Sequence, residues 1–193
     1  MSRSWLNFSA TLVFALPAFG SPETWQFDTP NTSAQFSVRH MGISTVHGAF
    51  GNVGGTVKYD PSDVARSSID VTIDAASLNT HAEMRDNHVK GPDFLDVAKY
   101  PKITFRSKRV QPAGAGHLKV TGDLTIHGTT KQVELDVLGP SSAIRDMDGN
   151  QRMGASATAK ISRAAFGVSN MEGMIGDELE ITIDAEMVKT AAH

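Results

Sequence analysis

Apolar and polar residues alternate along most of the chain, and the clearest example surrounds Gly128. A period of two residues places every second side chain on the same face of a β-strand. Glycine adopts the positive φ of a tight turn without steric cost. The pattern therefore predicts a β-hairpin that reverses within 127–130. Its inward-facing side chains are Leu118, Val120, Leu124, Ile126, Val133, Leu135 and Val137.

The same alternation recurs in segments 34–40, 69–73, 103–105, 155–161 and 179–187. Short turns or loops, such as 112–116 and 146–150, are expected between the strands. About eight strands with one wet face each are typical of an all-β fold, either an antiparallel sandwich or an up-and-down barrel.

Two features favour the barrel over the sandwich. The Gly-rich segment 41–59 predicts bulged or strongly coiled strands, and the inward face of 155–161 is made mostly of alanine. Both favour a closed barrel with unfilled interior space, and a barrel of eight strands can hold one small ligand.

One segment departs from the β-pattern. Thr80 and Glu83 match the capping box S/T-x-x-E, and Gly91 followed by proline can end a helix in a left-handed cap. We therefore expect a helix over 80–90. A further helical turn is expected over 93–100, and together the two form a cover for the barrel.

Residues 1–20 combine one early arginine, an apolar middle and small residues at the end, which predicts a cleaved signal peptide. The alternative is a membrane anchor. The run is shorter than the ~20 apolar residues of a spanning helix, and Asn7, Ser9 and Thr11 interrupt it. We therefore expect export to the periplasm or the medium, a single domain over 21–193, and no stable membrane anchor.

Composition narrows the function. The 193 residues include no cysteine, which excludes disulfides, thiol nucleophiles and thiolate metal sites. The formal charge is −3 and the basic residues form no block, which argues against a nucleic-acid partner. G-x-S-x-G, H-E-x-x-H and P-loop motifs are missing, and the histidines are scattered. We expect no enzyme, no cofactor and no metal site.

Several short motifs follow one another along the chain. They are Phe36-Ser-Val-Arg-His40 with Gly48-Ala-Phe50, Ser77-Leu-Asn-Thr80, Arg85-Asp86 with His88, Phe94-Leu-Asp96, Lys99-Tyr-Pro101 with Ile103-Thr-Phe105, Gly122 to Lys131, and Ile161 to Gly167. In this order they resemble the YceI-like family of polyisoprenoid-binding periplasmic proteins, over Trp25 to Val188. The resemblance implies an extended lipocalin-like antiparallel β-barrel with a short helical insertion at about 80–98. It also implies non-covalent binding of a long isoprenoid or similar amphiphile inside the barrel.

The candidate site consists of inward-facing apolar residues and a few polar ones at a mouth. The expected tunnel-lining residues are Phe36, Val38, Phe50, Phe94, Ile103, Phe105, Leu124, Ile126 and Phe166. The expected head-group residues are His40, Arg85 and His88.

Three functions compete at this point. The first is an exported protein that binds an isoprenoid or other long-chain lipid for transport, storage or sequestration. The second is an enzyme that acts on a bound amphiphile through His40 or the cluster Arg85, Asp86 and His88. The third is a stress-related structural module whose barrel is filled by side chains. The sequence leaves open whether the protein forms a homodimer.

Overall fold

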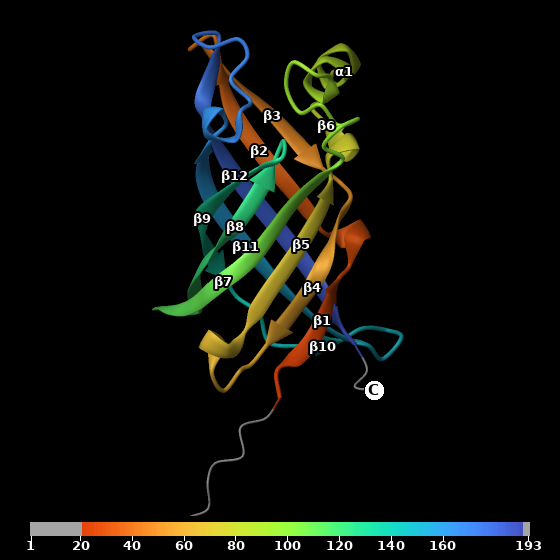
Figure 1. Ribbon diagram of the computed structural model, residues 1–193. Coiled ribbons are helices and arrows are strands. Elements are labelled where there is room, and N and C mark those ends of the chain that lie inside the picture. Colours follow the sequence, from red (N-terminus) through yellow and green to blue (C-terminus); the bar gives the residue numbers. More distant parts are fainter. Residues whose placement is uncertain (1–20, 191–193) are drawn as a thin grey trace, which may run out of the picture.

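The computed structural model describes residues 21–190, and strands dominate that part of the chain (Figure 1). The strands are β1 (Glu23–Phe27), β2 (Ser33–His40), β3 (Ser44–Phe50), β4 (Val53–Tyr59), β5 (Ser68–Asp74), β6 (Leu78–Asn79), β7 (Lys102–Gly114), β8 (His117–Ile126), β9 (Thr129–Leu138), β10 (Ile144–Arg145), β11 (Gln151–Ser162) and β12 (Ile175–Lys189). The helices are α1 (Glu83–Lys90) and the 3-10 turns η1 (Thr29–Asn31), η2 (Val64–Arg66), η3 (Ala75–Ser77) and η4 (Ala164–Phe166).

The strands close into an eight-stranded antiparallel barrel. Both β1 and β2 pair with β12, so they are two parts of one long interrupted strand. In the same way β4 pairs with β1 and β3 pairs with β2, which makes β3 and β4 parts of the next strand. Pairing of β11 with β12 completes an up-and-down order, and the predicted lipocalin-like barrel is confirmed.

The predicted hairpin around Gly128 is confirmed, and it joins β8 to β9. His127 and Gly128 have φ values of 50° and 73°, and Ile126 pairs with Thr129. Two central residues with positive φ define the tight turn whose twist suits two antiparallel strands. The Tyr100 ring also covers this glycine, since a Cβ at Gly128 would lie 2.5 Å from Cε1 of Tyr100.

The helix differs from the expectation. It begins at Glu83, its N-cap is Ala82, and no side chain caps it. Thr80 does not act as the cap because its hydroxyl donates to Oδ1 of Asp86 at 2.6 Å. Gly91 has φ −72°, so the predicted left-handed cap is also wrong. Residues 93–100 form hydrogen-bonded turns rather than a helical segment.

The expected loop at 112–116 is largely strand. β7 continues to Gly114, and Pro112 pairs with Leu118 of β8. On its other side β7 pairs with β5 only over Lys102–Arg106. Proline lacks an N–H group, so a strand tolerates it where one side has no partner. The turn itself falls at 115–116, with positive φ at both residues.

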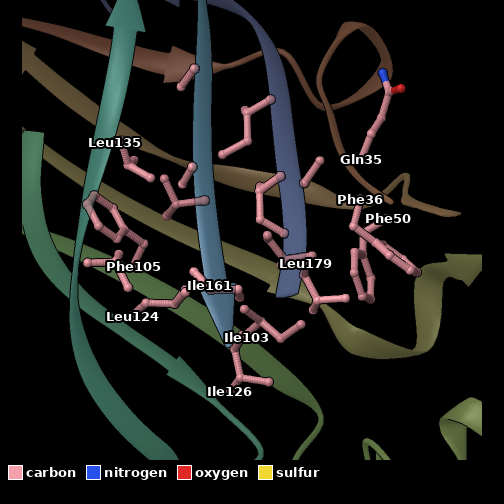
Figure 2. Close-up of a pocket in the computed structure, with 18 of the residues that line it drawn as sticks. Gln35, Phe36, Phe50, Ile103, Phe105, Leu124, Ile126, Leu135, Ile161 and Leu179 are labelled. Carbon is pink, nitrogen blue, oxygen red and sulfur yellow. The ribbon is translucent and has the colours of Figure 1, made fainter. Parts of the chain in front are cut away.

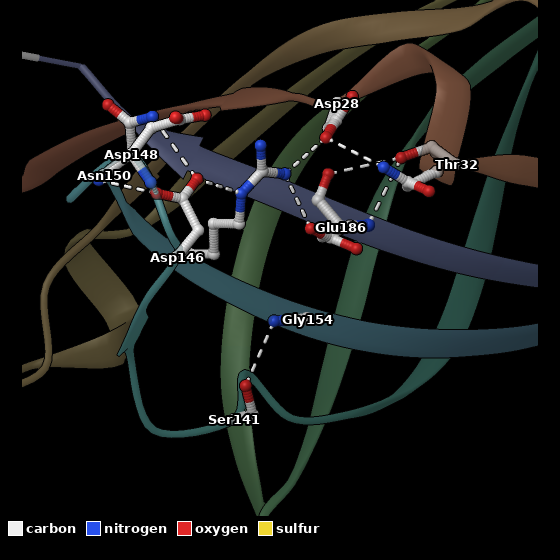
Figure 3. A network of polar contacts seen from close by, with 10 residues as sticks. Asp28, Thr32, Ser141, Asp146, Asp148, Asn150, Gly154 and Glu186 are labelled. Atoms are coloured by element: carbon white, nitrogen blue, oxygen red, sulfur yellow. Dashed lines mark hydrogen bonds and ion pairs between the residues drawn. The ribbon is translucent and has the colours of Figure 1, made fainter.

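We call the end of the barrel that carries α1 and the β8–β9 hairpin the helix end, and the other end, where β1 begins, the opposite end (Figure 1). An ion network ties the chain together near the opposite end. Arg152 of β11 donates to the carboxylates of Asp28, Asp146 and Glu186, and these three residues are labelled in Figure 3. The bond from Arg152 lowers the pKa of Asp146 to about 2. The network fixes the end of β1, the β10–β11 turn and β12 against one another.

Candidate ligand-binding cavity

The interior of the barrel holds a continuous apolar cavity of about 310 Å³. All eight barrel strands contribute inward-facing side chains to its wall, and α1 and the segment after it contribute more (Figure 2). A water molecule in the liquid occupies about 30 Å³, so the cavity is roughly ten times larger. This space contradicts the alternative of a barrel filled by side chains.

The exposed fractions of the inward-facing side chains show where the open space lies. Phe36, Leu124 and Leu179 point inward in the half nearer the helix end, yet they are only half-buried because they face the cavity. In the half nearer the opposite end, Val120 and Met187 are 0% and 3% exposed. Open space therefore lies in front of these three side chains in the half nearer the helix end, whereas Val120 and Met187 are enclosed by their neighbours.

The structure places all nine residues predicted to line a tunnel on the wall of this cavity. They come from strands β2, β3, β7 and β8, from η4, and from the segment after α1. Whether they contact a ligand stays a prediction. The nine are Phe36, Val38, Phe50, Phe94, Ile103, Phe105, Leu124, Ile126 and Phe166.

Two glycines on the inward face make room for aromatic rings. A Cβ at Gly48 would lie 2.5 Å from Cζ of Phe36, which is its cross-strand partner. A Cβ at Gly122 would lie 2.5 Å from Cζ of Phe105 and 2.5 Å from the carbonyl oxygen of Arg106. The two rings therefore lie over bare backbone, which is a recurrent use of glycine within strands. This packing keeps the rings close to the wall.

Two of the three predicted head-group residues line the cavity, and both lie at the helix end. His40 is the last residue of β2, and Arg85 is on α1. Arg85 donates from Nε to Oγ1 of Thr80 at 2.7 Å and from Nη2 to its carbonyl oxygen at 2.7 Å. The bonds from Thr80 to the Asp86 carboxylate lower the pKa of Asp86. Arg85 is thus held in place at the rim.

His88 is not among the residues on the cavity wall. Its Nε2 lies 3.7 Å from Oδ2 of Asp93, and its ring packs edge-on against Phe94 with 5.0 Å between the ring centroids. On α1, His88 is three residues beyond Arg85, and the structure does not bring the two together at the cavity.

Sequence reasoning missed Arg163, a buried cation at the helix end of the cavity. Its guanidinium donates four hydrogen bonds to backbone carbonyl oxygens. Hydrogen bonds from the Ser162 side chain and the Ala164 N–H lower the pKa of the nearby Asp177, and the charge of Arg163 adds to this effect. The accepting residues are Val168, Asn170, Ile175 and Gly176. A buried charge requires such bonds. Arg163 therefore stabilises the loop between β11 and β12. The signal available in the sequence was the position of Arg163 within the motif Ile161 to Gly167, which is one of those that resemble the family.

The wall between β9 and β11 is held by few strand contacts. These strands share three residue pairs, 156–158 with 136–138, whereas β11 and β12 share eleven. η4 contacts both β9 and β11, and its Phe166 is 1% exposed and lines the cavity. Phe166 therefore closes the side of the cavity where the strands diverge.

Residues 21–190 contain no cluster of three His, Asp or Glu side chains placed to hold a metal ion. The same residues include no helix with the length and apolar character needed to cross a membrane.

An up-and-down barrel of eight strands with a hollow apolar interior and a helical insertion defines the lipocalin-like class of antiparallel barrels. The chain belongs to the YceI-like family, whose YceI-like domain model matches residues 25–187.

The comparisons with individual proteins agree with this assignment. The chain is 32% identical to a UPF0312 protein of Vibrio cholerae over 188 residues, which cover 95% of this chain and 98% of that protein. The crystal structure of Burkholderia cenocepacia BcnA matches with a TM-score of 0.73 and 28% identity, over 83% of this chain and 98% of that one.

A polyisoprenoid-binding domain from Saccharophagus degradans matches with a TM-score of 0.63 over 86% of this chain and 98% of that one. At 14% identity, this likeness concerns the fold.

Proposed function

We propose that the protein binds one long apolar chain, an isoprenoid or a similar amphiphile, inside the barrel, and that it does so to transport, store or sequester that lipid. The observation that carries this proposal is the continuous apolar cavity, to which every barrel strand contributes. The fold shared with a polyisoprenoid-binding domain supports it.

The wall chemistry favours a long chain over a short one. Moving a CH₂-sized group from water to an apolar site gains about 0.8 kcal/mol. A five-carbon prenyl unit inside the cavity therefore gains several kcal/mol before the cost of ordering the chain. Affinity consequently rises with each prenyl unit until the cavity is full.

The polar end of the ligand lies at the helix end in this proposal. Within the described residues the wall carries two arginines and one histidine but no lysine, aspartate or glutamate, and these three residues, His40, Arg85 and Arg163, all lie at that end. The guanidinium of Arg85 is oriented by Thr80, and it suits a phosphate or another anionic head. His88 would contribute only indirectly, through its contact with Phe94.

We propose binding without catalysis. The cavity wall is almost entirely apolar, and His40 is its single histidine within residues 21–190. The leader-like pattern of residues 1–20 supports export to the periplasm or the medium.

A titration of the purified protein with a long polyprenol, followed by native mass spectrometry, tests this function. We expect one bound polyprenol per chain and weaker binding of a single-unit prenyl alcohol. A cavity that binds neither would contradict the proposal. Unchanged prenyl alcohol after long incubation supports a binding protein, whereas a converted product would support the enzyme.

A further inference from the structure

The cavity ends on four tightly packed side chains toward the opposite end, which we call the plug. The plug consists of Trp25, Val57, Met153 and Met187, which are 1%, 8%, 4% and 3% exposed. Val57, Met153 and Met187 also line the cavity, whereas Trp25 packs in the same cluster without lining it. Phe27, Tyr59 and Ile69 pack against the plug and also line the cavity, so the plug and these three side chains form the floor of the open space.

The plug lies where β4, β1, β12 and β11 pair side by side. Met153 of β11 and Met187 of β12 are cross-strand partners, and Met187 also faces Phe27 of β1. Trp25 pairs with Val57 on one side and Lys189 on the other. The strands behind the floor are thus hydrogen-bonded to one another, so the floor adjusts through its side chains more readily than through its backbone.

The two methionines are the adjustable part of this floor. Methionine is unbranched and flexible, and it fills irregular space in apolar sites. Directly beside the plug, Ala155 lines the cavity and is only half-buried, so open space begins there. The boundary between filled and open volume therefore falls between Ala155 and the methionine pair.

The ends of the cavity differ in charge. Arg85 and Arg163 lie at the helix end, and the plug carries no charged side chain. An amphiphile therefore lies with its polar end toward α1 and its apolar end toward the methionines.

We propose that Met153 and Met187 set the length of the chain that the cavity accepts, by ending the space available to the last prenyl unit. This inference rests on the proposed lipid-binding function. Replacing one methionine with alanine removes about three non-hydrogen atoms from the floor. The two replacements together open about the volume of one prenyl unit.

The test is a competition among linear polyprenols that differ by single prenyl units, with the bound fraction of each read by native mass spectrometry. For each of the variants Met153→Ala and Met187→Ala we expect the ratio of long-chain to short-chain binding to rise about tenfold. The reason is that each carbon added inside the cavity raises the association constant by up to about fourfold. Ala155→Met fills space above the plug, so it is expected to shift the ratio in the opposite direction.

Met147→Ala is the matched control, because Met147 is fully exposed in the β10–β11 turn. Its chain-length profile should equal that of the original protein. If the plug variants fail to fold, Ala155→Met still tests the proposal, because it is expected to shift the chain-length ratio in the opposite direction. Polyprenol binding with the same profile in all variants would overturn the length-setting role. No polyprenol binding by the original protein would instead overturn the proposed function.

Discussion

Filling the hollow half of the barrel should weaken lipid binding without destabilising the protein. Ala159 of β11 lines the cavity and is half-buried although it points inward, so space lies in front of its methyl group. Ala159→Leu adds three carbons to that space. A ligand loses the room for about three carbons, and at ~0.8 kcal/mol each this is about 2.4 kcal/mol, or roughly fifty-fold in Kd.

The free energy of unfolding separates a hollow interior from a packed one. A leucine forced into a packed core typically costs about 1–3 kcal/mol. In open space the same side chain gains apolar contacts, so the unfolding free energy of the ligand-free protein should stay constant or rise. Ligand must be removed first, because bound ligand stabilises the folded state by mass action.

Thr158→Leu is the matched control, since Thr158 is the exposed neighbour on the outer face of the same strand. The assays are a polyprenol titration and denaturant unfolding of the three proteins. We expect weaker binding only in Ala159→Leu. A loss of about 1–3 kcal/mol in stability together with unchanged binding would refute the hollow-interior reasoning.

Three further predictions follow from single contacts. Gly122→Ala places a Cβ 2.5 Å from the Phe105 ring and from a backbone oxygen, so we expect a loss of about 1–3 kcal/mol in unfolding free energy by denaturant titration. The pKa of Asp146 is lowered from 3.8 to about 2, so the stability it contributes is complete above pH 3.8 and is lost as the pH falls through about 2. Thermal melts across that range should show a weaker pH dependence in Arg152→Met, and an equal dependence would contradict the role of the network. Arg85→Met should weaken binding of a polyprenyl phosphate more than that of the uncharged polyprenol, whereas equal losses would place the head group elsewhere.

The sequence predicts the barrel well because alternation is a local property with a global consequence. Each strand needs an apolar face, so the inward positions of β2, β8 and β12 follow from a period of two. The tunnel-lining positions on the strands follow in the same way, whereas Phe94 and Phe166 lie outside the strands. The turn at Gly128 is also local, since it depends on two residues with positive φ.

The remaining features depend on contacts between distant segments. Thr80 matches a capping box, but its hydroxyl bonds to Asp86 instead. Pro112 is tolerated in β7 because β5 ends its pairing earlier, which no local pattern reveals. Alternation likewise cannot distinguish the hollow half of the interior from the plug, because both consist of inward-facing apolar residues.

The central claim is that the cavity is a binding site for a long apolar chain. Native mass spectrometry of the protein purified from its native cells, followed by organic extraction and identification of the released molecules, tests this most directly. We predict a co-purified lipid with a long chain, in a ratio of about one per protein. A barrel that is consistently empty and also rejects prenyl lipids in vitro would contradict the account.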